Sequence, residues 1–362
     1  MGNYRVIFDV LYLHENEIEF CYTILNNSLK GDQRMDNFRA LIVSKNESDF
    51  NVGINILHTD ELPEGDVLIR VHYSSVNYKD GLAAIPDGNI VKEYPHIPGI
   101  DLAGVVVESS SEQFKKGDEV IATSYEIGVS HFGGYSEYAR IPSEWIVPLP
   151  EGLSLKEAMV YGTAGFTAAL AIHQLEHNGL ERENGPVLVT GATGGVGSIA
   201  VTMLSKLGYD VVASTGKDSE HDFLYSLGAK EIISREELQP EKIRPLDKQR
   251  WAGAVDPVGG NTLAYVLSTT KYGGSVAVMG LTGGPKLGTT VFPFILRGVN
   301  LLGIDSVYCP MPLRKKLWER MATDLKPTIL SDLTTEVSLD ELPTTLKNIL
   351  SGKLKGRTVV KL

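Results

Sequence analysis

The sequence predicts an α/β fold, in which a doubly wound parallel sheet accompanies a second, β-rich domain. A short apolar run, Val187–Val189, is followed by a glycine-rich turn over Gly191–Gly197 and then by apolar residues at helical spacing. From there to about Gly303, strand-like and helix-like segments alternate, which is typical of a doubly wound domain. The earlier part of the chain has short alternating strands and turns. Because 362 residues are too many for one compact core, two domains are expected.

The individual elements follow from hydrophobic period and turn residues. In the first half we expect strands at 38–43, Asp66–Tyr73, Asp101–Glu108, Glu119–Thr123 and Glu144–Leu149, and then a helix at Leu155–His177. In the second half we expect strands at Val187–Val189, Asp210–Ala213, Glu231–Ser234, Gly253–Asp256, Ser275–Gly280 and Arg357–Leu362, a helix at Asp222–Leu227, and a helix with a basic face around Arg314–Arg320.

The glycine-rich turn indicates a dinucleotide-binding site. Glycines let the backbone approach a diphosphate, and the helix that follows offers free N–H groups and a partial positive charge. A purely structural turn is the alternative, but the flanking strand and helix favour the binding site. The next strand ends in Ser214, Thr215, Gly216 and Lys217, without the acid that usually binds the ribose of NAD. Hydroxyls and a lysine suit a 2′-phosphate, so we expect NADP(H), with a solvated loop role for Lys217 as the alternative.

Composition excludes several other classes of protein. The net charge of −11 argues against a general nucleic-acid or membrane-surface partner. The two cysteines, Cys21 and Cys309, lie far apart, which excludes a disulfide framework and a cysteine-rich zinc site and fits a reducing, cytoplasmic location. No run of 18 apolar residues is present, so no membrane-spanning helix is expected.

Residues 1–34 differ from the rest of the chain. They show no sustained period and no basic region followed by a long apolar core, so they are no secretory signal. Because a strand pattern begins soon after Met35, we expect an added leader outside the core. The alternative is a small arm that packs on the domain or on a partner.

Six collinear motifs resemble the acrylyl-CoA reductase family, a zinc-free branch of the medium-chain dehydrogenase/reductase superfamily, whose members are often labelled quinone oxidoreductases. The motifs are Asn77–Gly81, Gly99–Asp101, Ala122–Tyr125, Tyr161–Ala168, Asp256–Gly260 and Gly303–Val307. The resemblance covers about residues 36–362. Asn77 and Ile100 stand where the zinc enzymes of the superfamily have a cysteine and a histidine ligand, so no catalytic metal is expected.

The resemblance implies a GroES-like catalytic domain and a Rossmann domain. It places a non-core extension at 1–34, the catalytic domain at 35–158, the NADP-binding domain at 159–300, and a segment at 301–362 that returns to the catalytic domain. It also implies a homodimer, for which an edge strand near Val276–Met279 or Asn300–Gly303 could pair across a two-fold axis.

The resemblance also implies the residues of the site. Tyr78 would contact the nicotinamide and the substrate, and the other cofactor contacts would be Thr193, Gly194, Gly195 and Val196 at the diphosphate, Thr215, Gly216, Lys217 and Arg235 at the 2′-phosphate, and Leu281, Ile295 and Ser306 on the nicotinamide side. The family commonly has Ser-Gly-Arg where this chain has Thr215-Gly216-Lys217, so the charge is kept.

The implied activity is NADPH-dependent reduction of acryloyl-CoA to propionyl-CoA. A hydride would add to the β-carbon, charge would develop on the thioester oxygen, and the α-carbon would take a proton. Tyr78 is the candidate proton donor, and a purely packing role with solvent as donor is equally open. Lys79, Asp80 and Asp101 are interpreted as structural.

Two other functions stay open. One is the reduction of free quinones or small enones, and the other is NADPH binding without turnover. Basic residues are candidates for coenzyme A phosphates, although a solvated face explains such clusters more often; they are Arg297, Arg314, Lys315, Lys316, Lys353, Lys355 and Arg357.

Overall fold

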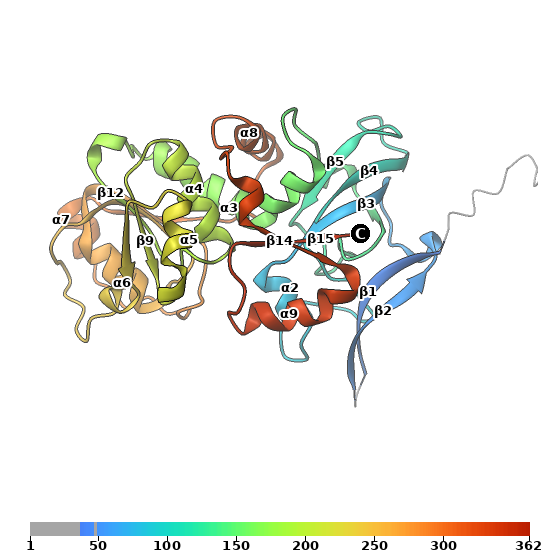
Figure 1. Ribbon diagram of the computed structural model, residues 1–362, viewed down its shortest axis with the longest axis horizontal. Helices are drawn as coiled ribbons and strands as arrows, with labels where there is room; N and C mark the ends of the chain where they lie inside the picture. Colours follow the sequence, from blue (N-terminus) through green and yellow to red (C-terminus); the bar gives the residue numbers. More distant parts are fainter. Residues whose placement is uncertain (1–36, 47–48) are drawn as a thin grey trace, which may run out of the picture.

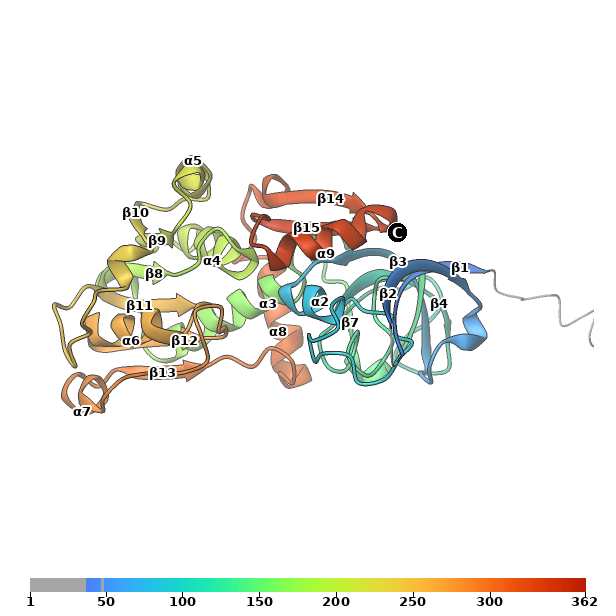
Figure 2. The same ribbon diagram turned by 90° about the horizontal axis from the view of Figure 1, so that it is seen from below.

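The computed structural model describes residues 37–46 and 49–362, so the leader expected at 1–34 lies outside the described residues. Two lobes lie side by side, and helix α3 (Leu155–His177) lies between them (Figures 1 and 2). The bounds of α3 agree with those predicted from the sequence. Within the described residues, no helix has the length and apolar character needed to cross a bilayer.

The first lobe is built on a six-stranded sheet with the order β10-β9-β8-β11-β12-β13. All neighbouring strands are parallel. This is the doubly wound order, and it confirms the predicted fold class. The strands are β8 (Val187–Val189), β9 (Val211–Thr215), β10 (Glu231–Ser234), β11 (Trp251–Asp256), β12 (Thr270–Val278) and β13 (Asn300–Gly303).

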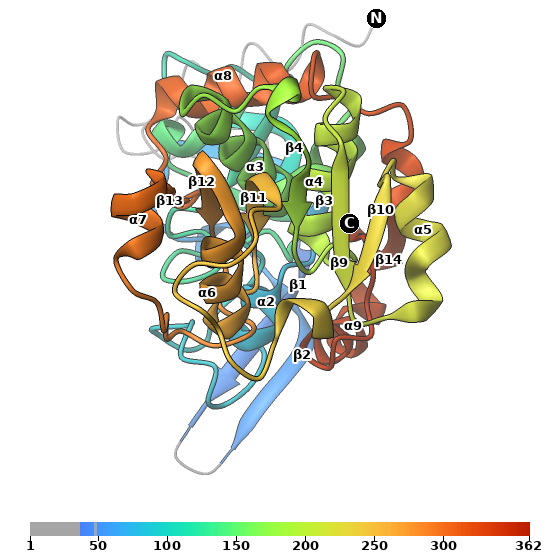
Figure 3. The ribbon, with the colours of Figure 1, turned by 90° about the vertical axis from the view of Figure 1, so that its left-hand side faces the viewer.

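Helices cover this sheet on both faces, and its central strands are fully buried, as their β-branched and small residues predict (Figure 3). The helices are α4 (Gly195–Lys206), α5 (His221–Ser226), α6 (Gly260–Thr269) and α7 (Phe292–Arg297).

The second lobe contains a seven-stranded, mainly antiparallel sheet, with the order β14-β15-β3-β4-β5-β7 and with β6 paired to β3. The last strand of the chain pairs with β3 and in parallel with β14, so residues more than 280 apart in sequence share one sheet. The strands are β3 (Val67–Ser75), β4 (Asp101–Ser109), β5 (Glu119–Thr123), β6 (Tyr138–Ile141), β7 (Ile146–Pro148), β14 (Thr334–Ser338) and β15 (Arg357–Lys361).

A hairpin of β1 (Phe38–Lys45) and β2 (Phe50–Leu57) projects from this lobe (Figure 3). Two helices complete the lobe, α2 (Tyr78–Ala83) and α9 (Leu342–Leu350). They pack so closely that a Cβ added to Gly81 would lie 2.8 Å from Ile349 Cγ2. The sequence patterns did not predict β2, α9 or β14, which are stabilised by contacts with β1, α2 and β15 respectively.

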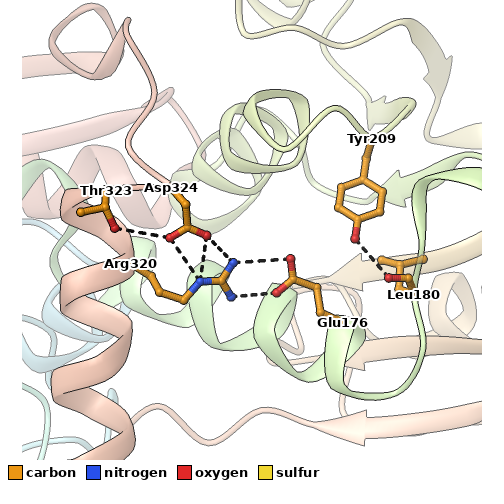
Figure 4. Close-up of polar contacts among 6 residues, drawn as sticks. All are labelled: Glu176, Leu180, Tyr209, Arg320, Thr323 and Asp324. Atoms are coloured by element: carbon orange, nitrogen blue, oxygen red, sulfur yellow. Dashed lines mark hydrogen bonds and ion pairs between the residues drawn. The ribbon is translucent and has the colours of Figure 1, made fainter.

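Helix α8 (Met311–Ala322) joins the long helix α3 through an ion-pair cluster (Figure 4). The guanidinium of Arg320 lies 2.7 Å from Glu176 of α3 and 2.6 Å from Asp324, one turn later in its own segment. These bonds raise the pKa of Arg320 against the opposing effect of burial. The cluster ties the C-terminal part of the chain to the helix between the lobes.

Candidate active site

The predicted diphosphate residues gather where β8 ends and α4 begins. Gly191 has a φ of +53°, a left-handed conformation that glycine adopts easily. A Cβ on Gly197 would lie 2.8 Å from Ala192 Cα, so only glycine allows the first turn of the helix to pack on the strand end. Thr193 to Val196 form the turn and the start of α4, with Gly194 as the N-cap. The turn therefore presents backbone N–H groups and the positive end of a helix, as a diphosphate requires.

The predicted 2′-phosphate residues lie at the ends of β9 and β10. The guanidinium of Arg235 lies flat on Gly216, since a Cβ there would come within 2.6 Å of Arg235 Cζ. Lys217 donates from Nζ to the Gly352 carbonyl at 2.7 Å, which places its ammonium beside the loop before β15. Thr215 is buried at the strand end and its hydroxyl accepts from the Lys217 N–H. The structure thus brings all four residues to one edge of the sheet, where the Arg235 guanidinium lies against Gly216 and the Lys217 ammonium is held by the Gly352 and Leu354 carbonyls.

Leu281 lies at the same edge of the sheet, after β12. It faces the turn after β11, because a Cβ on Gly259 would lie 3.4 Å from Leu281 Cα. That turn is held by Asp256, which accepts from the Thr190 hydroxyl and from the Gly259 N–H. Burial raises the pKa of Asp256. The Leu281 side chain is exposed, which leaves it free to meet a ligand.

Ser306 lies in the loop after β13 and is buried. Its hydroxyl accepts a hydrogen bond of 2.8 Å from Thr167 of α3. The nicotinamide-side residue is therefore fixed to the helix between the lobes.

Tyr78 is the first residue of α2, and its side chain is 49% exposed. Asn77 is the N-cap of this helix, and the buried carboxylate of Asp80 accepts from its N–H at 2.8 Å and from the Ile100 N–H at 3.0 Å. Burial and the charge of Asp101 raise the pKa of Asp80 to about 7. Asp80 therefore anchors the turn that carries the half-exposed Tyr78.

A buried polar network lies beneath Tyr78 and is centred on Asp101. The Asp101 carboxylate accepts from Ser75 Oγ at 2.5 Å and from Asn77 Nδ2 at 2.7 Å. It also accepts from the Thr163 N–H at 2.9 Å and from the Thr163 hydroxyl at 2.5 Å. The four donors come from two distant segments, residues 75–77 and Thr163, and together they satisfy a carboxylate that would otherwise be costly to bury.

The N–H of Thr163 is free to donate because α3 is interrupted just before it. Gly162 has φ +49° and ψ −155°, which is non-helical. A Cβ there would lie 2.5 Å from Asp101 Oδ2, so the position accepts only glycine. At Gly162 the close approach is therefore to Asp101.

Arg357 joins this network to the diphosphate turn. It donates to Ser75 Oγ at 2.9 Å and to the Val76 carbonyl at 3.2 Å, and it is buried. Its Nη1 lies 2.9 Å from where a Cβ on Gly195 would be. One guanidinium thus contacts both the segment before Tyr78 and the start of α4.

The expectation that basic residues of the tail could meet coenzyme A phosphates is wrong for three of them. Arg314 and Arg357 are buried, and the guanidinium of Arg297 is used on the Ser268 and Asp247 carbonyls. Each guanidinium finds several backbone or hydroxyl acceptors inside the fold, which is a non-local arrangement that a charge pattern does not reveal.

Ile295 is not brought to the other predicted cofactor residues within this chain. It lies on α7, exposed, and Arg297 at the end of that helix donates to the Ser268 and Thr270 carbonyls at the amino-terminal start of β12. Leu281 follows the opposite, carboxyl end of the same strand. Ile295 stays a prediction.

The residues at the zinc position of related enzymes do not fit a metal. Asn77 uses its side-chain amide on Asp101, Ile100 has no ligand atom, and Asp101 is occupied by four hydrogen bonds. Among residues 37–46 and 49–362, no three His, Cys, Asp or Glu side chains gather as metal ligands would. No step of the chemistry is therefore assigned to zinc.

Comparison with known proteins identifies the family. Residues 63–151 match the alcohol dehydrogenase GroES-like domain, and residues 195–323 match the model described as zinc-binding dehydrogenase. Acrylyl-CoA reductase AcuI of Ruegeria pomeroyi is 50% identical over 89% of this chain and 98% of its own length.

Two solved structures have a similar fold. Bacillus subtilis protein YhfP with NAD bound has a TM-score of 0.89 and 61% identity over 90% of this chain and all of its own. Escherichia coli K-12 YhdH with bound NADPH has a TM-score of 0.86 and 46% identity over 89% of this chain and 99% of its own. The chain belongs to the medium-chain dehydrogenase/reductase superfamily of oxidoreductases, and it has the GroES-like and Rossmann domains of that family.

Proposed function

We propose that this protein uses NADPH to reduce the C=C bond of acryloyl-CoA to give propionyl-CoA. The observation that carries the proposal is the position of Arg357, which contacts both the turn before Tyr78 and the helix start that would bind a diphosphate. This supports a site in which the segment before Tyr78 and the start of α4 lie on two sides of one buried residue. The 50% identity to a protein named acrylyl-CoA reductase supports the choice of substrate.

NADPH is favoured over NADH because the Arg235 guanidinium lies against Gly216, where the 2′-phosphate would lie, and the Lys217 ammonium is held nearby by the Gly352 and Leu354 carbonyls. Lys217 and Arg235 flank Gly216, and the strand before them ends in Thr215 rather than in an acid. One relative structure holds NADPH and another holds NAD, so the preference of this chain rests on its own cations.

When bound, NADPH supplies the hydride that adds to the β-carbon of the enoyl thioester. The chain's own residues orient the reactants. Gly194 and Gly195 would leave room for the diphosphate at the start of α4. Ser306 and Thr167 would lie on the nicotinamide side, and Tyr78 is the first residue of α2. The Tyr78 hydroxyl would give a proton to the α-carbon, which takes the negative charge out of the enolate.

The test follows the absorbance of NADPH with purified protein and acryloyl-CoA, with crotonyl-CoA, a quinone and NADH as comparisons. Fast turnover with acryloyl-CoA and NADPH alone is expected. Turnover with a quinone only would contradict the thioester proposal and favour the second candidate, quinone reduction. That candidate has its own support, because YhfP carries a provisional quinone oxidoreductase name. NADPH binding without turnover of any acceptor would contradict both.

The role of Tyr78 is tested in the same assay with Tyr78→Phe. Loss of a general acid is expected to lower kcat by about 10²–10⁴-fold. Tyr272→Phe is the matched control, because Tyr272 is an exposed tyrosine of β12 near its amino-terminal start. An unchanged kcat in Tyr78→Phe would show that the ring only packs and that solvent delivers the proton.

We also propose that the protein is a cytoplasmic homodimer formed along β13. This strand ends the six-stranded sheet, and no described strand of the same chain pairs with its outer edge. Exposed apolar side chains surround the short helix that precedes it, which is unusual for a free surface. They are Val291, Phe292, Ile295 and Leu296. A second copy on a two-fold axis would pair the strands and cover these side chains.

A further inference from the structure

Arg314 is a cation in an unfavourable place. It lies in the first turn of α8, near the positive end of the helix dipole, and none of its side chain is exposed. Its four hydrogen bonds end on neutral oxygens, so no carboxylate offsets the cost of burying the charge through these bonds. Such a cost is expected only where the guanidinium does something that an apolar side chain could not do.

The two ends of the guanidinium hold two segments that are far apart in sequence. Nη1 donates to the carbonyl and the hydroxyl of Thr123, the last residue of β5, at 3.3 and 3.0 Å. Nη2 donates to the carbonyls of Ser306 and Val307, in the loop after β13, at 2.8 and 3.0 Å. The planar guanidinium, with two separate Nη atoms, donates to both segments at once. The single ammonium of a lysine does not.

Two aromatic rings fix the plane of the guanidinium. The guanidinium carbon lies 4.6 Å from the centre of the Tyr125 ring and 4.7 Å from that of Phe166. Both distances are those of cation–π contacts. Among the described residues, Nε of Arg314 has no hydrogen-bond partner although it is buried. The two Nη atoms therefore make the polar contacts of this side chain.

The segment held on the catalytic side is strained. Ser124 and Tyr125 have φ values of +68° and +50°, a left-handed conformation that is unfavourable for side chains larger than glycine. Arg314 contacts both ends of this turn, through Thr123 and through the Tyr125 ring. Ser124 Oγ then lies 3.0 Å from the hydroxyl of Thr163, which donates to Asp101 beneath Tyr78.

We propose that Arg314 is a positioning residue, which fixes the turn at Ser124 and the loop at Ser306 relative to each other and so positions Ser306 for the nicotinamide. The inference rests on the proposed function in one respect, namely that Ser306 lines the nicotinamide. Arg314 would not touch the substrate, and it would act through the two loops that it joins.

The test compares Arg314→Lys with Arg320→Lys on the same helix. Both changes keep the charge and remove the planar guanidinium, but Arg320 binds Glu176 and Asp324 and not the turn at Ser124 or the loop at Ser306. For Arg314→Lys we expect kcat to fall by about 10–100-fold, because small misplacement of reacting atoms is costly. The dissociation constant for NADPH should change less than about 3-fold, since the phosphates supply most of that affinity. For Arg320→Lys we expect a lower melting temperature and an unchanged kcat.

Two further readouts separate this inference from the proposed function. The acceptor is whichever compound the wild-type protein reduces, so a quinone reductase would test it equally well. Fluorescence of bound NADPH, measured without any acceptor, reports the surroundings of the nicotinamide and should fall in Arg314→Lys. Deuterated NADPH should give a larger isotope effect on kcat, because hydride transfer becomes slower than the other steps.

Thr123→Val is a milder variant in case Arg314→Lys does not fold. It removes the Thr123 hydroxyl that accepts from Arg314 Nη1 and nearly conserves the volume of the side chain. We expect it to lower kcat, but by less than Arg314→Lys does. The proposal is overturned if both variants keep the wild-type kcat, isotope effect and NADPH fluorescence while only the melting temperature falls. It is also overturned if Arg320→Lys lowers kcat as much as Arg314→Lys does.

Discussion

At the scale of single residues, Arg235 is the group best placed to choose between the two dinucleotides. Its guanidinium is exposed and lies against Gly216, at the end of the strand where the ribose of the adenosine would bind. We expect Arg235→Met to weaken NADPH binding by about 10–100-fold, because a charge-assisted hydrogen bond contributes about 1.5–3 kcal/mol. NADH, which has no 2′-phosphate, should bind as before. Fluorescence titration with each dinucleotide measures both, with Arg244→Met, an exposed arginine of a later loop, as the control. Equal weakening for NADPH and NADH would contradict this role.

The same scale shows what could be predicted from the sequence and what could not. Lys217 and Arg235 follow strand ends in local motifs, so their neighbourhood could be predicted and the structure brings them together. Arg314 and Arg357 have ordinary surface-like sequence surroundings, yet both are buried. Their acceptors lie up to 282 residues away, as for Arg357 and Ser75, and no local pattern encodes such a pairing.

At the scale of elements, the interruption of α3 at Gly162 frees the Thr163 N–H to bind Asp101 of the second lobe. We expect Gly162→Ala to destabilise the protein by more than about 2 kcal/mol and to lower activity, because the new Cβ would lie 2.5 Å from Asp101 Oδ2. Gly179→Ala after the C-terminal end of the same helix is the control. Its φ is +83° but nothing lies within 4 Å of the added Cβ, so it should cost only the strain of about 1–2 kcal/mol. Denaturant unfolding and kcat measured on both variants check this, and equal effects would show that backbone strain alone matters.

Helices and strands could be predicted where the spacing of apolar residues within the segment is enough to define them. The bounds of α3, β8 and β10 agree with the sequence prediction, because these segments have strong periods and clear ends. The kink inside α3 was not predicted, since Gly162 is non-helical only in the presence of Asp101 and Ser75, which belong to other strands. Short helix α9 has its partner α2 far away in sequence, and its existence also depends on tertiary packing.

At the scale of the whole molecule, the free edge of β13 and the apolar side chains beside it bear on assembly. We expect the protein to be a dimer in solution and Leu296→Asp to make it a monomer, because a buried carboxylate without a partner would face an apolar surface. Tyr225→Asp is the control, since Tyr225 is an exposed residue of α5 beside β10, at the other end of the sheet order. Light scattering coupled to gel filtration measures the mass. A monomeric wild-type protein, or a dimer that survives Leu296→Asp, would exclude this interface. Turnover by the monomeric variant would then show whether the exposed Ile295 contributes to the site only when a second copy covers α7.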